Sequence, residues 1–150
     1  MKFISVLKGI IVGVITSIVI PIVNIGVLSR FAGGSPIYFS NSWSYIASFM
    51  TVVPVAAFIG LYFTNKKSLT NKQRWVISSI VVLLIGIFIN TVGITIGYFI
   101  VQGSLEKVNI ISELPFRFLT VALSLPISIP LGKLIIDILY RWINKIPLEN

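Results

Sequence analysis

Two asparagines, Asn24 and Asn90, stand inside long apolar runs of this sequence. Each lies about 24 Å along a helix from the basic residue that begins its run, at 1.5 Å per residue. An amide surrounded by hydrocarbon needs hydrogen-bond partners. One interpretation is a polar site that Asn24 and Asn90 line together with Thr91 and Thr95. The other, which we favour, is a clamp between helices, in which the amides bond each other or a free carbonyl.

A second set of polar residues, Lys133, Asp137 and Arg141, recurs every four residues near the end of the chain. This spacing places the three side chains on one face of a helix. Asp137 could be a carboxylate that couples to a proton or a cation, because ionisable residues within membranes are often functional. We favour a charge ladder on an amphipathic helix that leaves the bilayer, with Lys133 extended toward the headgroups.

Prolines interrupt two of the apolar runs at Pro54, Pro126 and Pro130. A proline within a helix removes one backbone hydrogen bond and bends the helix. The carbonyl released in this way could coordinate a cation or a substrate. We favour the simpler interpretation that these prolines fix the shape of their helices.

Pairs of glycines four residues apart, Gly9 with Gly13 and Gly93 with Gly97, allow close approach of helices. The contact could lie within one chain or between two copies, and the spacing agrees with both.

Most catalytic chemistry is excluded by what the sequence lacks. It has no cysteine, no histidine and four acidic residues, and it carries no nucleotide-binding loop or zinc signature. We therefore expect no enzymatic activity, no cofactor and no metal site.

The elements that must hold these residues are membrane helices. Of the 150 residues, 56% are hydrophobic and 11% are charged, whereas a soluble domain has roughly a quarter charged residues. A helix needs about 20 apolar residues to cross the hydrocarbon core. The sequence predicts an all-α membrane protein with four spans, at about 8–28, 45–63, 75–101 and 116–146.

The basic residues predict how the chain is oriented. If it crosses four times, most of them fall on one side: Lys2, Lys8, Lys66, Lys67, Lys72, Arg74, Lys133, Arg141 and Lys145. The positive-inside rule then places both termini in the cytoplasm of a multi-pass protein of the cell membrane. Anionic lipid headgroups explain the net charge of +8 better than nucleic acid does, so we expect the bilayer as partner and no nucleic acid.

The second half of the chain repeats the order of features of the first. At an offset of 66 residues, Lys8 corresponds to Arg74 and Asn24 to Asn90. At an offset of 72 residues, Pro54 corresponds to Pro126 and Gly60 to Gly132. This order predicts two two-helix units, 1–65 and 66–150, the second with an amphipathic C-terminal helix end. A two-span unit begins and ends on one side, so its copy inserts in parallel.

The segments "VNIGVLSRF" and "INTVGITIGYF", each followed by a loop and a helix with a central proline, resemble a family of small bacterial membrane proteins. That family consists of duplicated two-helix units and is a domain of unknown function. The sequence departs from the expected pattern where Pro115 and Phe116 replace Trp43 and Ser44. The resemblance implies an architecture and no activity.

Two functions agree with these features. The first, toward which the sequence leans, is transport or permeation of a small solute or ion, with a path near Asn24 and Asn90. Four spans make a thin pathway, so this function predicts a homodimer or larger oligomer. The alternative is a non-catalytic accessory or protective protein that binds another membrane component.

Overall fold

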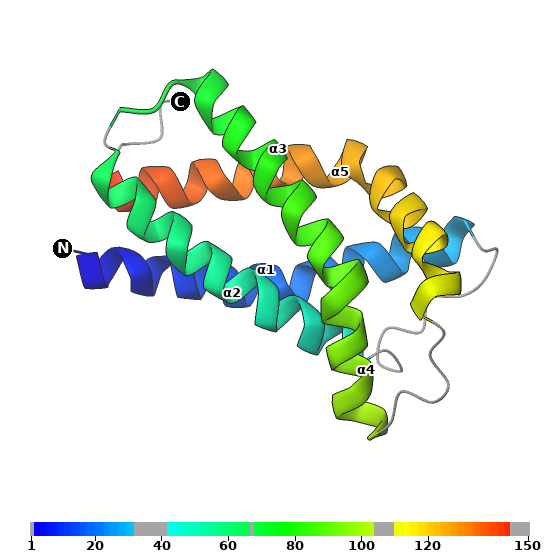
Figure 1. Ribbon diagram of the computed structural model, residues 1–150. Helices are drawn as coiled ribbons and strands as arrows, with labels where there is room; N and C mark the ends of the chain where they lie inside the picture. The colour runs from blue at the N-terminus through cyan, green and yellow to red at the C-terminus, as the bar shows by residue number, and fades with distance from the viewer. Residues whose placement is uncertain (1, 32–41, 67, 104–109, 145–150) are drawn as a thin grey trace.

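The computed structural model describes residues 2–31, 42–66, 68–103 and 110–144 of the chain. Within these ranges some side chains are not described, among them those of residues 23–31 and 110–113. The described residues form helices and short connections, with no strand among them. The elements are α1 (Lys2–Phe31), α2 (Ser42–Asn65), α3 (Asn71–Phe88), the π-helical turn η1 (Ile89–Gly93), α4 (Ile94–Gln102) and α5 (Ile110–Asn144) (Figure 1).

Long apolar runs become helices because a helix satisfies its backbone hydrogen bonds internally, as hydrocarbon requires. Four stretches are long and apolar enough to cross a membrane: Lys2–Ile22, Ser44–Asn65, Asn71–Val101 and Arg117–Asn144. They confirm the all-helical class and the four apolar segments that the sequence predicts. The relation of the two halves as repeats and the side on which the termini lie stay predictions.

Local signals fix the two ends of the third span. Thr70 caps α3, because its hydroxyl accepts a hydrogen bond from the Gln73 amide at 3.3 Å. The Gln73 side chain accepts in return from the Thr70 amide at 2.9 Å, which completes a capping box. At the other end Gly103 has φ +72°, a left-handed conformation that glycine adopts without strain, and α4 stops there.

Helices α1 and α2 form the closest helix pair (Figure 1). The buried positions of α1 recur every four residues, at Ser5, Gly9, Gly13, Ser17 and Pro21. A Cβ atom on Gly9 would collide with the carbonyl oxygen of Ala56, so the two backbones meet without side chains between them. This contact needs small residues, because van der Waals packing is the main attraction between helices in lipid.

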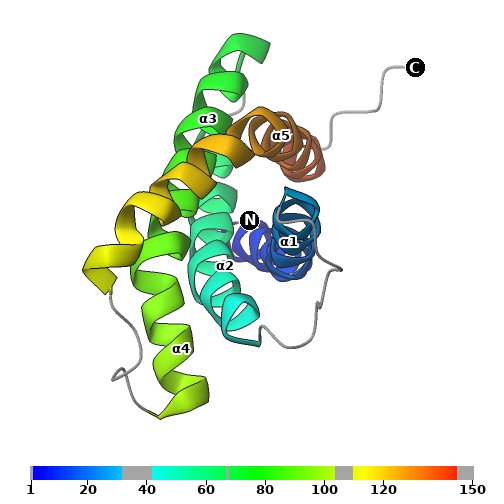
Figure 2. The same cartoon turned by 90° about the vertical axis from the view of Figure 1, so that its right-hand side faces the viewer.

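The third span changes its partner along its length. Its first part, α3, packs against α5, whereas η1 and α4 pack mainly against α2. Figure 2 shows α2 lying between α1 and the α3–α4 helix. The π turn stands where the partner changes, and a π turn holds one residue more than an α turn in the same helix.

One end of the bundle gathers the start of α1, the connection between α2 and α3, and the end of α5. Lys8 Nζ donates to the carbonyl oxygen of Trp142 at 2.6 Å, and the Leu69 amide donates to the Tyr140 hydroxyl at 2.9 Å. We call this the basic end, because Lys8, Arg74 and Arg141 lie on the helix segments that meet there (Figure 1, left).

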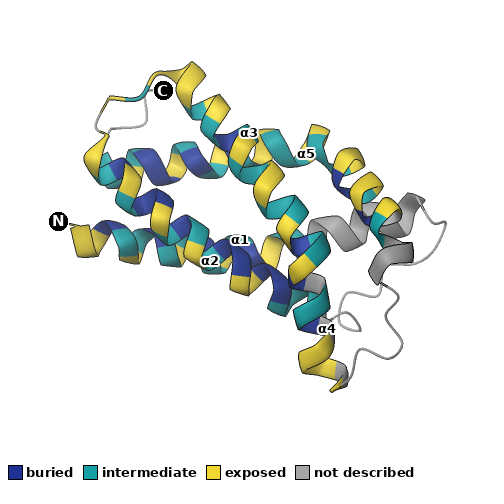
Figure 3. Ribbon diagram, viewed as in Figure 1, coloured by how far each residue is buried: buried dark blue, intermediate teal, exposed yellow. Residues whose placement is uncertain are grey.

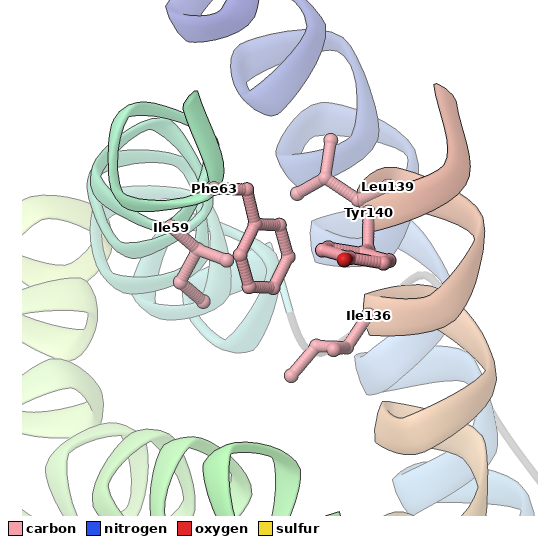
Figure 4. Packing of buried hydrophobic residues seen from close by; sticks show 5 residues of the cluster. All are labelled: Ile59, Phe63, Ile136, Leu139 and Tyr140. Atoms are coloured by element: carbon pink, nitrogen blue, oxygen red, sulfur yellow. The ribbon is translucent and has the colours of Figure 1, made fainter. Parts of the chain in front are cut away.

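A buried cluster near the basic end joins α2 to α5. Ile59 and Phe63 of α2 face Ile136, Leu139 and Tyr140 of α5 (Figure 4). The rings of Phe63 and Tyr140 meet edge to face with centroids 5.3 Å apart, an arrangement that aromatic rings prefer. The cluster fixes the first hairpin to the last helix.

The outer faces of the helices remain apolar and exposed (Figure 3). Phe58 is 70% exposed and Leu84 is 59% exposed. Exposed apolar area of this extent marks contact with lipid or with another protein. The bundle is therefore apolar both inside and outside, as expected for a protein dissolved in lipid.

Candidate functional site

A cavity of about 160 Å³ lies between α1, α2, α3, η1 and α5. Its walls are mostly aliphatic, with Val12 from α1, Val55 from α2, Ile85 from α3 and Leu125 from α5. An apolar cavity of similar size, about 150 Å³, takes up benzene in another protein. The space therefore fits a ring or a short length of hydrocarbon chain.

The cavity reaches the outer surface of the bundle. Val19 of α1 and Leu131 of α5 both line it, yet they are 44% and 41% exposed. Both lie in stretches that could cross a membrane. A molecule dissolved in the bilayer could therefore enter from the side, without passing through water.

Four polar side chains line the cavity among the described residues: Thr16, Asn90, Ser124 and Ser128. The sequence prediction found Asn90 and missed the three hydroxyl residues. The signal that could have found them is their position within apolar spans, where a hydroxyl needs a partner. Serine and threonine are common in membrane helices, however, and their sequence positions do not show which face they occupy.

The predicted partners of Asn90 lie elsewhere or are not described. Thr91 and Thr95 donate to carbonyls of their own helix, those of Ile87 and Thr91, at 2.7 and 2.9 Å, and neither lines the cavity. Asn24 belongs to α1, but its side chain lies outside the described residues.

The Asn90 amide bonds within its own helix, since Nδ2 donates to the Gly86 carbonyl oxygen at 2.9 Å. Replacing Asn90 by leucine should therefore lower the free energy of unfolding by less than about 0.6 kcal/mol, which is the average for a hydrogen bond between membrane helices. Unfolding in mixed detergent micelles measures this change. A loss above about 0.6 kcal/mol would show instead that the amide has a partner on another helix, as the clamp interpretation requires.

A buried arginine stands beside the π turn. Arg117 of α5 is 7% exposed, and its Nη1 donates to the backbone carbonyl of Asn90 at 3.3 Å. A backbone carbonyl oxygen has two lone pairs, so it can accept from a side chain in addition to its helical bond. Asn90 thus contacts α5 through its backbone, a contact that sequence spacing does not predict.

In the predicted charge ladder, Asp137 pairs with Lys133 as expected, but its second partner is Arg74 and not Arg141. Asp137 forms ion pairs with Lys133 on its own helix and with Arg74 Nε of α3, the latter at 2.7 Å. Arg141, the third member expected from the sequence, forms no ion pair within the part of the chain that the structure describes. The carboxylate therefore links two helices, which the i, i+4 spacing alone cannot show.

Arg74 also holds the connection between α2 and α3. Its Nη1 donates to the Leu69 carbonyl at 2.6 Å, and its guanidinium lies 5.1 Å from the centre of the Tyr140 ring. Lys133 is similarly placed 5.5 Å from the Trp75 ring centre. Such contacts stabilise cations that are largely removed from water. The arrangement is suited to fixing helices in place at the basic end.

Three of the four glycines in the predicted packing pairs, Gly9, Gly13 and Gly93, lie on helix contacts of this chain. Gly13 faces α2, where a Cβ atom would stand 2.9 Å from Cα of Val53. Gly93 faces Ala47, with 3.2 Å between the Cβ positions, and Gly97 is buried. These contacts form within one chain and need no second copy.

The glycines of the repeated phrase face similar places on their partner helices. Gly60 lies against the backbone of Ser5 in α1, whereas Gly132 lies against the side chains of Val82 and Ser78 in α3. Ser5 and Ser78 are 73 residues apart in the sequence, and the two glycines are 72 residues apart. The offset predicted for these two helices is 66, so the separation of the serines exceeds it by seven residues. Seven residues are two helical turns, so the same face is used. The repeat itself stays a prediction.

The three predicted bend positions lie inside continuous helices. Pro54 is within α2, while Pro126 and Pro130, with Pro115, are within α5. Helix α5 changes direction along its length (Figure 1), as expected where prolines interrupt the hydrogen bonds of a helix.

Comparison with protein-family models, with curated proteins and with solved structures finds no match for this chain. The resemblance to a bacterial family of duplicated hairpins stays a prediction.

Proposed function

We propose that this chain is a non-catalytic, multi-pass protein of the cell membrane that binds an apolar membrane component between its two hairpins. The cavity between α1, α2, α3 and α5 carries the proposal. Binding sites for small molecules are typically concave and mainly apolar, with a few polar groups placed among the apolar ones. The cavity has these properties and opens where hydrocarbon would surround it.

The occupant expected on physical grounds is part of a lipid molecule. At about 160 Å³ the cavity is too small for a whole phospholipid and large enough for a chain segment or a ring. Burying apolar surface of a ligand that comes from water contributes about 25 cal/mol per Å². A ligand that enters from the hydrocarbon of the membrane is already in apolar surroundings, so its burial in the cavity brings no such gain. Shape therefore has to provide the selectivity.

The orientation in this proposal has both termini in the cytoplasm. Basic residues on α1, α3 and α5, with Lys66 and Lys72 beside the α2–α3 connection, favour the cytoplasmic side for the basic end. Anionic headgroups would be the neighbours of these side chains.

A pair of matched variants tests the proposed function. Val12 lines the cavity, whereas the adjacent Ile11 is exposed on the outer face of α1. With the protein in nanodiscs that contain a diazirine-bearing fatty acid, light should attach the label to cavity residues such as Ile85 and Leu125. Val12→Phe should reduce labelling at these positions at least about fivefold by filling the cavity, and Ile11→Phe should leave it unchanged.

Site-resolved mass spectrometry reads the labelled positions, and labelling of the exposed Phe58 serves as the internal reference. If both variants label Ile85 and Leu125 as the unmodified protein does, the cavity does not bind acyl chains and the proposal fails.

A second candidate function is permeation of a small solute through a homodimer or larger oligomer. One observation favours it: Asn90, the polar residue expected to line a path, does line the cavity. Native mass spectrometry from nanodiscs distinguishes the two functions. An oligomer would support permeation, and a single chain that carries one lipid-derived molecule would support binding.

A further inference from the structure

The polar side chains of the cavity lie in the part of it that is farther from the basic end. Measured along their helices from the basic end, Thr16, Asn90, Ser124 and Ser128 lie between about 21 and 30 Å, at 1.5 Å per residue. Ile59 and Leu139 line the same cavity within about 9 Å of that end. The cavity therefore has an apolar part toward the basic end and a part with polar groups away from it.

Three of these four polar groups donate a hydrogen within their own helices. Thr16 Oγ1, Ser124 Oγ and Asn90 Nδ2 each donate to a carbonyl oxygen three or four residues earlier, at 2.7–2.9 Å. A hydroxyl has one hydrogen to donate but two lone pairs. The Thr16 and Ser124 oxygens thus retain capacity to accept, and Asn90 retains its Oδ1. This part of the cavity offers more acceptors than donors.

Asn90 keeps a second N–H that can donate, but most of the remaining capacity is for accepting, so a complementary ligand should donate at least one hydrogen. A purely apolar occupant would leave the remaining lone pairs of these oxygens unused. A carboxylate or phosphate would place its own lone pairs against theirs. A neutral hydroxyl or N–H group would instead complete their hydrogen bonding.

We propose that the cavity binds a membrane-soluble molecule with an apolar body and a neutral hydroxyl or N–H donor, with that donor directed to Thr16, Asn90 and Ser124. This inference rests on the proposed function, because it assigns the class of molecule to the same cavity. The apolar body would extend toward Ile59 and Leu139.

Two small probes of nearly equal size test the assignment. 4-Fluorophenol and 4-fluorotoluene differ in one group, a hydroxyl against a methyl, and each carries a fluorine that NMR can follow. Binding to the full-length protein in nanodiscs is measured for each probe and divided by its partition into protein-free nanodiscs. We expect about a three- to tenfold tighter binding of 4-fluorophenol, as one net hydrogen bond provides.

Variants of the acceptors assign this preference to the cavity. In Thr16→Val combined with Ser124→Ala, the preference for 4-fluorophenol should disappear while 4-fluorotoluene binds as before. Thr91→Val is the matched control: Thr91 also donates to its own helix, but it does not line the cavity. This control should keep the full preference.

Three outcomes would overturn the assignment. Equal binding of both probes to the unmodified protein would show that no donor is selected, and the cavity would remain a site for apolar groups. Equal loss of both probes in the double variant would show that the hydroxyls only shape the cavity. Binding of both probes that Val12→Phe does not reduce would place them outside the cavity and contradict the proposed function as well.

Discussion

Replacing Asp137 by asparagine should lower the free energy of unfolding by about 2–3 kcal/mol. Removing one member of a buried ion pair costs about 3–5 kcal/mol, and partial exposure reduces that value. The Asp137 side chain is 23% exposed, while those of Arg74 and Lys133 are 16% and 7% exposed. The variant leaves two cations close together and largely removed from water. Unfolding in mixed detergent micelles measures the change.

Two further variants show whether the charge causes this loss. Arg141→Gln, one turn further along α5, should change stability by less than about 0.5 kcal/mol. Adding Lys133→Met to Asp137→Asn should recover part of the loss, because the cation that remains buried is removed. If the double variant is less stable than Asp137→Asn alone, the cost does not come from the uncompensated lysine.

Replacing Gly9 by alanine should cost about 3 kcal/mol, at the upper end of the range for overpacking. The added methyl group would meet the carbonyl oxygen of Ala56 and approach Cα of Ala57 to 2.9 Å, and backbone atoms cannot rotate away as side chains can. Helices α1 and α2 would have to separate. The same unfolding measurement applies, and an engineered cysteine pair across α1 and α2 would show the separation as slower cross-linking.

Gly86→Ala is the matched control, because Gly86 lines the cavity and faces a side chain. Its methyl group would stand 3.2 Å from Cγ1 of Val121, which can move into free space. Alanine is also a better helix former than glycine by about 1 kcal/mol. We expect no loss or a small gain in stability. Equal losses in the Gly9 and Gly86 variants would contradict the close backbone contact.

Helix positions could be predicted well from this sequence, because they depend on one property. Long uncharged runs can only be helices in hydrocarbon, so the four spans follow from composition and length. The π turn at Ile89–Gly93 could not be predicted, since "INTVG" has no local signal that distinguishes it from α-helix. The π turn lies where the third span stops packing against α5 and begins to pack against α2. This position depends on tertiary packing and not on the local sequence.

The candidate site was predicted in part. Asn90 lines the cavity because a lone amide in an apolar run must face the protein interior, which is a strong constraint. The sequence predicts Arg74 as a topological charge and as the counterpart of Lys8 in the repeat, yet the structure pairs it with Asp137, 63 residues away. A pair between residues so far apart depends on which faces of α3 and α5 meet, and periodicity within one helix contains no such information.

The change of partner within the third span also determines how far this chain can be divided. A cut in the connection between α2 and α3 would separate α1 and α2 from the remaining helices. The first fragment would expose the face of α2 that α4 normally covers, and in the second fragment α4 would lack its partner helix. Synthesised together in one bilayer, the two fragments should reassemble into a protein of two chains. The hairpin would remain the predicted unit of repetition, and the whole bundle would be the unit that folds.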